Sequence, residues 1–559
     1  MKKYLSTALA MLLVVGLAGC GQAQETGSSD GSATQTQETE QTTGSDEGIT
    51  VAVAAQFTTL DPALNTEMVN DYVIYHLYSG LFRYDADGQP QPELCETYET
   101  SDDGLTWTFH LRDAKWSDGS KITADDFVYS YLRVLSYGAD NAYNAYDMTS
   151  IIEGAQEYND RALEAGSGFD CTTEDHSGVG IEATDENTFV LRLKSPCTFL
   201  PRVLNSMCWL PVTQSTPQHD SLWAMEPGFV TCGPYTLTEI NPNEKAVLNK
   251  NPQYFNADKI TMPEITYQVM TDMDAQLVAF QAGSVDIACD VSLDSAAQYV
   301  GTDSMWLQEG PTNYFLAINS GSTGPDWAKD VNVRRALAKA IDKNAIAEIL
   351  GGVSFYPVLD GYIPYGFPDT NGKDFRDNAP ATANGYDLEE AKALLAQAGY
   401  DESNPLHITY KYSNNGLHGD VATALQSMWA AAGIDVEFAA VEAGVFYDQL
   451  DAGDFEISRY GYTANTSPSK FLELWTTGMQ VVAAVDDATY DKKIEEIKAE
   501  PDPDRFMEKC HDAENYLYEE NVYLIPLFQY NTPSLKNPAL NGAEDIMGEL
   551  FFGHTSWAR

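Results

Sequence analysis

The sequence predicts a mixed α/β protein of two or three domains, and three observations support that prediction. A strand, a turn and a helix follow one another between Asp102 and Leu135. From about Thr312 onward, helical patterns alternate with short apolar strands, which is typical of a sheet with crossover helices. The part of the chain with a folding composition has about 510 residues, too many for one core at typical domain sizes of roughly 100 to 200 residues.

The first 19 residues have the pattern of a secretory signal peptide. Lys2 and Lys3 precede an apolar run over residues 8–18, which is too short for a stable transmembrane helix. The run ends in Leu-Ala-Gly-Cys, which looks like a bacterial lipobox in which Cys20 becomes the lipidated first residue. Cleavage that leaves an unmodified cysteine is the alternative. We expect an exported chain whose acyl groups at Cys20 anchor it to the cell membrane, on a Gram-positive-like surface or a periplasmic face.

Residues 20–48 do not have the composition of a folded segment. Between Gly21 and Gly48 the chain is mainly Gly, Ser, Thr, Gln and Glu, with no aromatic or branched aliphatic residue. Such a segment cannot bury enough apolar surface to fold, so it should act as a disordered tether. The folded body is expected to begin near Ile49.

Charge and cysteine content exclude several classes of function. The formal net charge is −51, from 83 acidic residues against 32 Lys and Arg. Such a chain is not a nucleic-acid binder, and anionic lipid should repel it. Seven cysteines remain besides Cys20, and their odd number leaves at least one free thiol. There is no C-x-x-C pair and the histidines are scattered, so the sequence supports neither a zinc site nor a redox motif, and no metal or cofactor is expected.

The first elements of the body are defined by side-chain periodicity and capping. Residues 105–112 alternate apolar and polar side chains, which predicts a strand with Trp107 on its buried face. Thr123 and Asp126 then have the spacing of a capping box ahead of an amphipathic helix that reaches Leu135. The same criteria predict further elements: a helix over 70–81, a strand over 188–193, an apolar loop and helix over 196–211, a helix over 274–282 and a strand over 285–287.

The same criteria predict a larger share of helix in the second half of the chain. Amphipathic spacing, Asp or Asn near the first turn and Gly after the last turn mark the helices. The pattern predicts strands over 314–318, 434–438 and 455–457, helices over 331–350, 387–399, 421–432 and 445–450, and a final apolar run over 522–528 that crosses back to the first half.

Several of these stretches resemble one family. Residues 103–135 strongly resemble the signature region of family 5 extracellular solute-binding proteins, the peptide and dipeptide receptors of ABC importers. Their sequence is DGLTWTFHLRDAKWSDGSKITADDFVYSYLRVL. VNVRRALAKAID, YDLEEAKALLAQAGY and the passage over 426–436 are similar to the family in the same order. The resemblance extends from Ile49 to the C-terminus.

The resemblance implies an α/β, two-lobed, periplasmic-binding-protein-like clamp (Venus flytrap) with an extra inserted domain in the first lobe. The expected boundaries are 49–80 with 195–311 and 523–559 for lobe 1 (domain I), 81–194 for the inserted domain II and 312–522 for lobe 2 (domain III). A ligand would bind between the lobes. The implied protein is not an enzyme: it is a monomer that carries peptides to ABC permease subunits driven by a cytoplasmic ATPase.

The expected cleft segment is residues 458–468, rich in Gly, Pro and aromatic residues. Peptide receptors of the family carry an aspartate here that pairs with the ligand's α-amino group, and the matching position is Asn465. An asparagine accepts a hydrogen bond but supplies no counter-charge, and a desolvated cation without one is costly. The acidic residue usually found before the proline is replaced by Ser467. Either another carboxylate supplies the pairing or the ligand has no free N-terminus.

Further site residues are implied by the same match, each with a structural alternative. Arg459 matches an arginine that lies near a ligand carboxylate in some oligopeptide receptors, although pairing with an acidic side chain of the chain itself is equally open. Aromatic candidates for pocket walls could equally serve core packing. The remaining candidates are Tyr143, Tyr460, Tyr462 and Trp475 as aromatic residues, Cys232 and Gly233 at a turn near the ligand, and Thr463 at the position of a cysteine in some enteric members.

Three alternatives stay open on the sequence. The same fold resembles receptors for oligosaccharides, metal complexes such as nickel complexes, opines and modified peptides, and Asn465 makes a non-peptide or N-blocked ligand a serious alternative. A surface-anchored hydrolase would suit an acidic chain. The folded body, however, contains no G-x-S-x-G elbow and no H-E-x-x-H motif. An adhesin or sensory lipoprotein could use the same clamp without transport.

Overall fold

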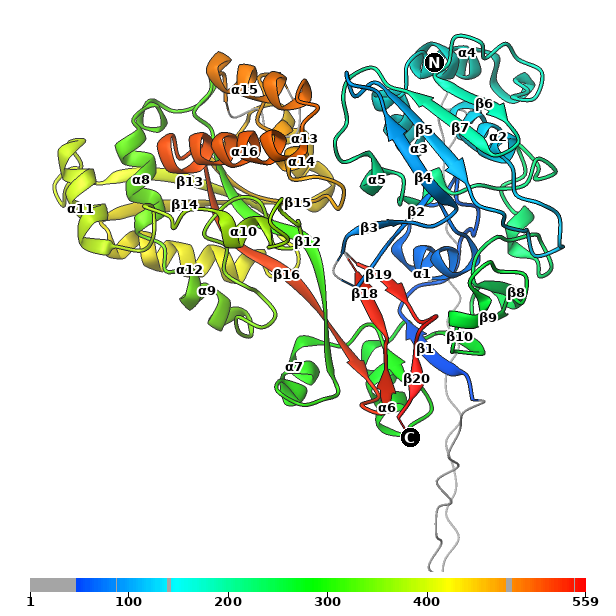
Figure 1. Cartoon of the computed structure of the whole chain (residues 1–559). Helices are drawn as coiled ribbons and strands as arrows, with labels where there is room; N and C mark the ends of the chain where they lie inside the picture. The colour runs from blue at the N-terminus through cyan, green and yellow to red at the C-terminus, as the bar shows by residue number, and fades with distance from the viewer. Residues whose placement is uncertain (1–46, 87, 138–141, 479–484, 547, 559) are drawn as a thin grey trace, which may run out of the picture. The chain divides into compact units, whose positions relative to one another are not determined.

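The computed structural model describes residues 47–558 except 87, 138–141, 479–484 and 547 (Figure 1). The proposed signal peptide, Cys20 and nearly all of the tether lie outside the described residues. The described residues belong to one compact unit. None of its helices is long and apolar enough to cross a membrane.

A ten-stranded mixed sheet runs through both halves of the chain. Its strands, in spatial order, are β14 (Ile434–Val441), β13 (Leu406–Ser413), β15 (Ile457–Thr463), β12 (Met305–Ile318), β16 (Leu524–Lys536), β11 (Ile287–Ala288), β1 (Ile49–Val53), β10 (Glu264–Val269), β9 (Lys245–Lys250) and β8 (Tyr235–Asn241).

The two longest strands, β12 and β16, are neighbours in the middle of this sheet and connect its two parts. They pair antiparallel with each other over most of their length, with a register shift between Glu309 and Asn313. Beyond the shift, β12 pairs with β15, whereas the far end of β16 pairs with β11. The sheet therefore passes from one half of the chain to the other along this one ribbon.

The first half packs α1 (Met68–Leu77) against the C-terminal end of the chain. His76 stacks on the ring of Phe551 and its Nε2 accepts a hydrogen bond from the backbone N–H of Phe552 at 2.9 Å. The C-terminal strands form two small ribbons, β18 (Glu544–Ile546) with β19 (Glu549–Phe551) and β17 (Leu540–Asn541) with β20 (Ser556–Trp557). Two helices, α6 (Met273–Gln281) and α7 (Leu293–Ala296), complete this half.

A second, four-stranded sheet has the order β4-β5-β7-β6. Its strands are β4 (Cys95–Thr100), β5 (Thr106–Leu111), β6 (Ile181–Asp185) and β7 (Thr188–Arg192), and its helices are α2 (Ala124–Ser136), α3 (Ala142–Ile151) and α4 (Ala155–Ala165). Trp107 is buried on β5 and the Thr123–Asp126 capping box opens α2, which confirms both predictions. The ribbon of β2 (Phe82–Tyr84) and β3 (Pro90–Pro92) precedes this sheet, and α5 (Leu200–Val203) follows it.

Helices cover both faces of the large sheet in the second half. Along β12, Tyr314 and Leu316 belong to one apolar cluster while Phe315 and Ala317 belong to another, because alternate side chains point to opposite faces. The helices are α8 (Val331–Lys339), α9 (Lys343–Leu350), α10 (Phe375–Asn378), α11 (Leu388–Gln397), α12 (His418–Ala431), α13 (Ala443–Asp451), α14 (Pro468–Glu473), α15 (Ala488–Lys498) and α16 (Pro503–Glu514).

Several predicted elements differ from the structure in their ends, such as the helix expected over 70–81, which is Met68–Leu77, and the strand expected over 314–318, which is Met305–Ile318. Two differ in kind or continuity. The helix expected over 331–350 is divided into α8 and α9, because the side chain of Asp342 accepts a hydrogen bond from the backbone N–H of Ala345 and caps a new helix. The loop expected after Ile457 is instead strand, since β15 continues to Thr463 in antiparallel register with β12.

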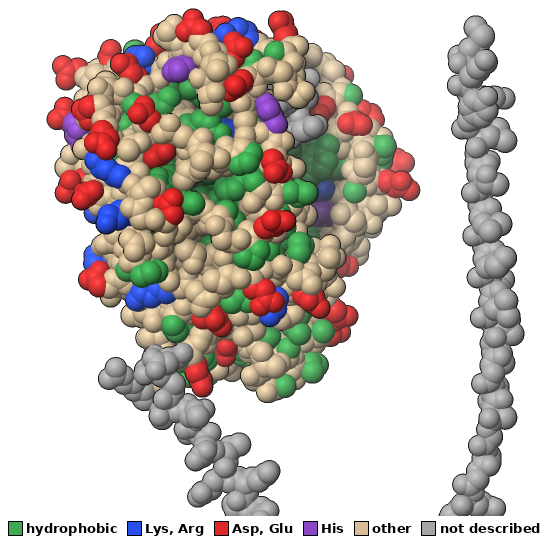
Figure 2. Space-filling model, turned by 90° about the vertical axis from the view of Figure 1, so that its right-hand side faces the viewer, with side chains coloured by type: hydrophobic (Ala, Val, Ile, Leu, Met, Phe, Trp, Pro, Cys, Tyr) green, Lys and Arg blue, Asp and Glu red, His purple; other side chains and the backbone are tan. Residues whose placement is uncertain are grey.

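The acidic surface and the free cysteines agree with the sequence, which predicts an acidic chain with at least one free thiol. Carboxylates are spread over the face shown in Figure 2, with Lys and Arg scattered among them. The seven cysteines in the described part of the chain are all free and buried. Burial raises the pKa of Cys171 to about 11, which disfavours its reactive thiolate.

Candidate functional site

A cavity of about 370 Å³ lies beside the end of β15, where segments from distant parts of the chain meet. Residues 462–466 after and within β15 form one wall, together with the first turns of α14. The remaining lining comes from the start of α1, from α3, from the segment after α5 and from β19. These residues are Asn65, Thr66, Asp71, Asn144, Tyr146, Asp147, Ser206, Met207, Cys208 and Glu549.

Three of the sequence-predicted residues, Tyr462, Thr463 and Asn465, line this cavity together. The hydroxyl of Thr463 lies 2.8 Å from that of Thr312 on β12, which fixes the end of the strand. The backbone carbonyl of Asn465 accepts a hydrogen bond from Nη2 of Arg202 at 3.2 Å. The loop that follows β15 is therefore held at the cavity, and its role in ligand binding remains a prediction.

Arg459 lies on β15, opposite Leu316 of β12, and is not among the residues that line the cavity. It is 8% exposed, donates from Nη2 to the hydroxyl of Ser413, and places its guanidinium 4.6 Å from the ring centre of Phe446. Within the described residues no carboxylate forms an ion pair with it, and its buried Nε has no hydrogen-bond partner. The alternative in which Arg459 is neutralised by a nearby acidic side chain is therefore not what this structure contains.

The other predicted aromatic residues are placed mostly in the interior. Tyr460 packs against Phe315 in an apolar cluster that also contains the fully buried Trp475. Tyr143 belongs to α3, but its side chain lies outside what the structure describes. Its neighbour Tyr146 lines the cavity and is 65% exposed, so α3 does contribute an aromatic wall.

Cys232 and Gly233 lie against the end of α1 and are not part of the cavity lining. The backbone N–H of Ser79 donates to Sγ of Cys232 at 3.3 Å. A Cβ on Gly233 would come within 2.5 Å of the carbonyl carbon of Leu77, so only glycine fits this close approach of two backbones. In this structure both residues position the turn before β8.

The cavity is acidic. Its lining includes four carboxylates and one lysine, and Lys470 is 3.8 Å from the carboxylate of Glu473. Burial raises the pKa of Asp71 to about 7, opposed by a hydrogen bond from Asn65. Burial, together with the nearby carboxyls of Asp71 and Asp545, raises the pKa of Glu549 well above its usual range. Within the described residues no group of three or more His, Cys, Asp or Glu could hold a metal ion.

Residues 89–481 match the family model described as bacterial extracellular solute-binding proteins, family 5 Middle. The chain belongs to this family. The dipeptide-binding protein DppE of Bacillus subtilis is 28% identical over 499 residues, which is 87% of each chain. Among solved structures, the unliganded open form of MppA, a periplasmic murein tripeptide binding protein, has a TM-score of 0.79 at 24% identity over 91% of this chain and 97% of its own.

A solved structure with a bound peptide can be compared with this unliganded, open one. Haemophilus influenzae OppA in complex with RPPGFSPFR has a TM-score of 0.63 at 25% identity, over 91% of this chain and 99% of its own. The two-lobed fold is thus common to both structures, and the chain superposes better on the open, unliganded one. This family member has the α/β clamp that the sequence predicts.

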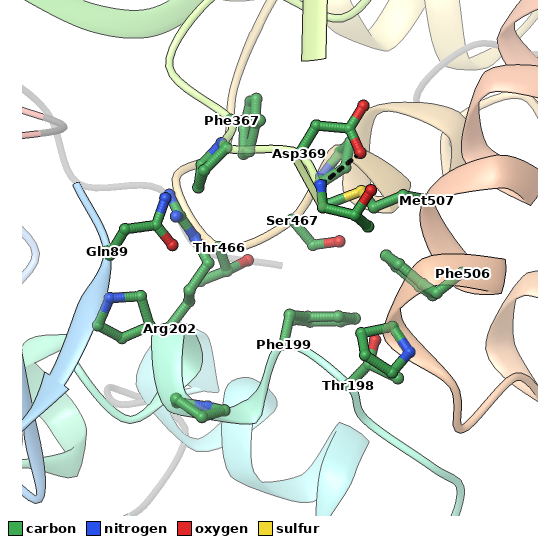
Figure 3. Close-up of a pocket in the computed structure, with 16 residues that line it drawn as sticks. Gln89, Thr198, Phe199, Arg202, Phe367, Asp369, Thr466, Ser467, Phe506 and Met507 are labelled. Carbon is green, nitrogen blue, oxygen red and sulfur yellow. Dashed lines mark hydrogen bonds between the residues drawn. The ribbon is translucent and has the colours of Figure 1, made fainter. Parts of the chain in front are cut away.

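A smaller pocket of about 200 Å³ lies on the other side of the loop after β15 (Figure 3). Its walls are largely apolar, with Phe199, Phe367 and Phe506 among the residues that surround it. Arg202, 8% exposed, lies at one side and donates from Nη1 to the carbonyl of Gly88 at 3.0 Å. Burial without a carboxylate partner lowers the pKa of this guanidinium. Because its Nη2 also donates to the carbonyl of Asn465, Arg202 connects the loop after β15 to α5.

Proposed function

We propose that this chain captures peptides in the cavity beside β15 and delivers them to the permease of an ABC importer. The single observation that supports this role most strongly is the composition of the cavity wall. Residues 462–466 face side chains of α1, α3 and β19, so a ligand there would contact both halves of a family 5 clamp at once. Relatives such as DppE are named for dipeptide binding.

The proposed domain boundaries are 49–80 with 195–311 and 523–559 for domain I, 81–194 for domain II and 312–522 for domain III. The four-stranded sheet lies within the second range, and β13, β14 and β15 lie within the third. The long strands β12 and β16 begin or end beyond these limits, so the boundaries between domains I and III fall inside the β12–β16 ribbon.

The physical basis of capture is closure. A clamp closes around a ligand when contacts made only in the closed form outweigh the cost of closing. Peptides suit such a site because their backbone groups are constant, so main-chain hydrogen bonds supply affinity while wet pockets tolerate different side chains. The closed, loaded form is the state that a permease would recognise. The chain itself performs no chemistry in this scheme.

We place the protein outside the cytoplasm, as a monomer anchored through lipidated Cys20 and residues 20–48. The signal-like N-terminus and the family's extracellular description support this placement. The net charge of −51 opposes direct adsorption to anionic lipid. The acyl anchor would therefore be needed to keep the protein at the membrane.

Native mass spectrometry of the full chain, purified in detergent from cells grown in rich medium, tests the proposal. Denaturing release of whatever the protein holds should yield a ladder of masses that resolves into peptides of one length range. A sugar, a metal complex or a single N-blocked compound in place of that ladder would contradict general peptide capture and favour the changed specificity that Asn465 raises.

A further inference from the structure

The loop after β15 contributes the neutral amide of Asn465 to the cavity, whereas four other lining residues carry carboxylates. Asp71 and Glu549 line the same cavity as Asn465, and they come from α1 and from β19. They come from opposite ends of the sequence, and no local motif connects them.

Each of the two carboxylates has a defined support. Asp71 lies in the first turn of α1 and its Oδ1 accepts a hydrogen bond from the side-chain amide of Asn65. Glu549 begins β19 and pairs in register with Ile546 of β18. The hydrogen bond from the backbone of Phe552 to His76 attaches this hairpin to α1.

The side chain of Glu549 makes no hydrogen bond or ion pair with any described residue, and its Oε2 is inaccessible to solvent. A buried polar oxygen without a partner is costly and calls for an explanation. The cation with the largest influence on Glu549 is Arg83, whose Nε is already 2.8 Å from Glu93. A further carboxyl, Asp545, lies nearby and accepts from the backbone N–H of Glu309 at 3.1 Å.

We propose that Asp71 and Glu549 together bind a cationic amine of the ligand, in the first place the α-ammonium group of a peptide. An ammonium has three donors and can satisfy both carboxylates, whereas the amide of Asn465 on the opposite wall supplies a neutral hydrogen bond. This inference rests on the proposed peptide-binding function and names the group of the peptide that is recognised. The counter-charge for the ammonium would then come from α1 and β19, not from the loop after β15.

The site should release a proton when it is filled. The groups that act on the pair are Glu67 at the N-cap of α1, Asp545 on β18 and Arg83 on β2, with Lys470, Glu473 and Asp147 elsewhere in the cavity lining. Burial and like charge raise both pKa values, so the empty pair retains a proton near pH 7, and an ammonium group favours the fully ionised pair. Affinity should therefore rise from pH 6 to pH 7.5.

Binding of defined peptides to the full chain in detergent tests the site. The probe is a synthetic peptide library of two to nine residues without Lys, Arg or His, in free-amine and N-acetylated forms. A third library is N-acetylated and carries one Lys, which separates an α-ammonium from a side-chain ammonium. Calorimetry in two buffers of different ionisation enthalpy measures the released proton.

We expect free-amine peptides to bind at least tenfold more tightly than their acetylated forms. Glu549→Gln and Asp71→Asn should each weaken free-amine binding at least tenfold and reduce the proton release. The matched control is Glu544→Gln on the same hairpin, whose carboxylate is outside the cavity lining and near His554. It should leave binding unchanged. Thermal unfolding of each variant separates lost folding from lost binding.

The outcomes separate the two proposals. If wild type binds free-amine and acetylated peptides equally, or if both carboxylate variants fold and bind like wild type, the amine site is wrong while peptide capture stands. Tighter binding of the acetylated Lys library than of the free-amine library would assign the pair to a side chain and overturn the α-ammonium assignment. Binding of none of the libraries would overturn the proposed function and the amine site together.

Discussion

Two arginines near the end of β15, Arg202 and Arg459, have no carboxylate partner among the described residues, in a chain with 83 acidic residues. Arg202 bonds to backbone carbonyls and Arg459 to a serine hydroxyl. Neutralising partners are abundant in this sequence, so a guanidinium left without one at a binding cavity is a candidate for an anionic ligand group. Arg459 remains the predicted contact for a peptide's carboxylate end.

Replacing Arg459 with Ala should weaken peptides with a free C-terminal carboxylate by about 1.5–3 kcal/mol, the usual range for a charge-assisted hydrogen bond. C-terminally amidated peptides should be little affected by the same change. Calorimetric titration of matched free and amidated peptides measures the difference. An equal loss for both would mean that Arg459 acts through packing on Phe446.

The acidic cluster also predicts a pH dependence for the empty protein. Burial raises the pKa values of Asp71 and Asp545 to about 7, and burial with the neighbouring carboxyls raises the pKa of Glu549 well above its usual range. Between about pH 4 and pH 7 the folded state therefore holds more protons than the unfolded state. The free energy of unfolding should then fall as pH rises through this window. Urea denaturation from pH 5 to pH 8 measures it. Glu549→Gln should flatten the profile, and a variant profile parallel to wild type would contradict this assignment.

At the residue scale, the sequence predicted one wall of the cavity and missed the other. Tyr462, Thr463 and Asn465 follow one another in a recognisable stretch, so they could be found by reading along the chain. Asp71 and Glu549 could not, because they meet only after the C-terminal hairpin packs on α1. Neither has a neighbouring motif that distinguishes it from the many solvated carboxylates of this chain.

At the element scale, periodicity predicted most of the strands and helices, and its two failures have physical causes. Ser458, Arg459 and Tyr460 look polar enough for a loop, but both faces of the large sheet are covered by aromatic residues, so these side chains are interior. The division between α8 and α9 depends on the side chain of Asp342, which caps α9. The apolar residues keep helical spacing across this cap, so periodicity alone predicts one continuous helix.

Gly233 provides a test of packing between elements. Gly233→Ala should destabilise the protein by roughly 1–3 kcal/mol or more, because the added Cβ would meet the backbone of α1 at Leu77 and Tyr78. The control is Gly444→Ala in α13, where nothing lies within 4 Å of the added Cβ. That change should stabilise the protein by roughly 0.5–1 kcal/mol. Denaturant midpoints compare the two variants, and equal effects would exclude a steric role for Gly233.

At the scale of the whole molecule, the net charge of −51 creates a field that favours cationic ligands. The cavity is acidic like the surface around it, since carboxylates outnumber Lys and Arg on the face in Figure 2. The ligand is expected to approach along this field and then meet the local carboxylates of the cavity.

Association rates should therefore depend on peptide charge and on salt. A peptide with two added Lys should associate faster than the same peptide with two added Glu at about 20 mM salt. The difference should shrink at about 300 mM, where the Debye length is well below 10 Å. Stopped-flow fluorescence measures both rates. Rates that do not change with salt would mean that the net charge serves solubility alone.

The hairpin that carries Glu549 is separate from the large sheet. Every strand of that sheet lies within residues 49–536, whereas β19 follows it in the sequence. The hydrogen bond from the backbone N–H of Phe552 to His76 holds this segment on α1. The large sheet could therefore form while the hairpin is undocked, and the cavity would then lack one of its carboxylates. Docking of one short hairpin thus links the fold of the C-terminal segment to the charge of the cavity.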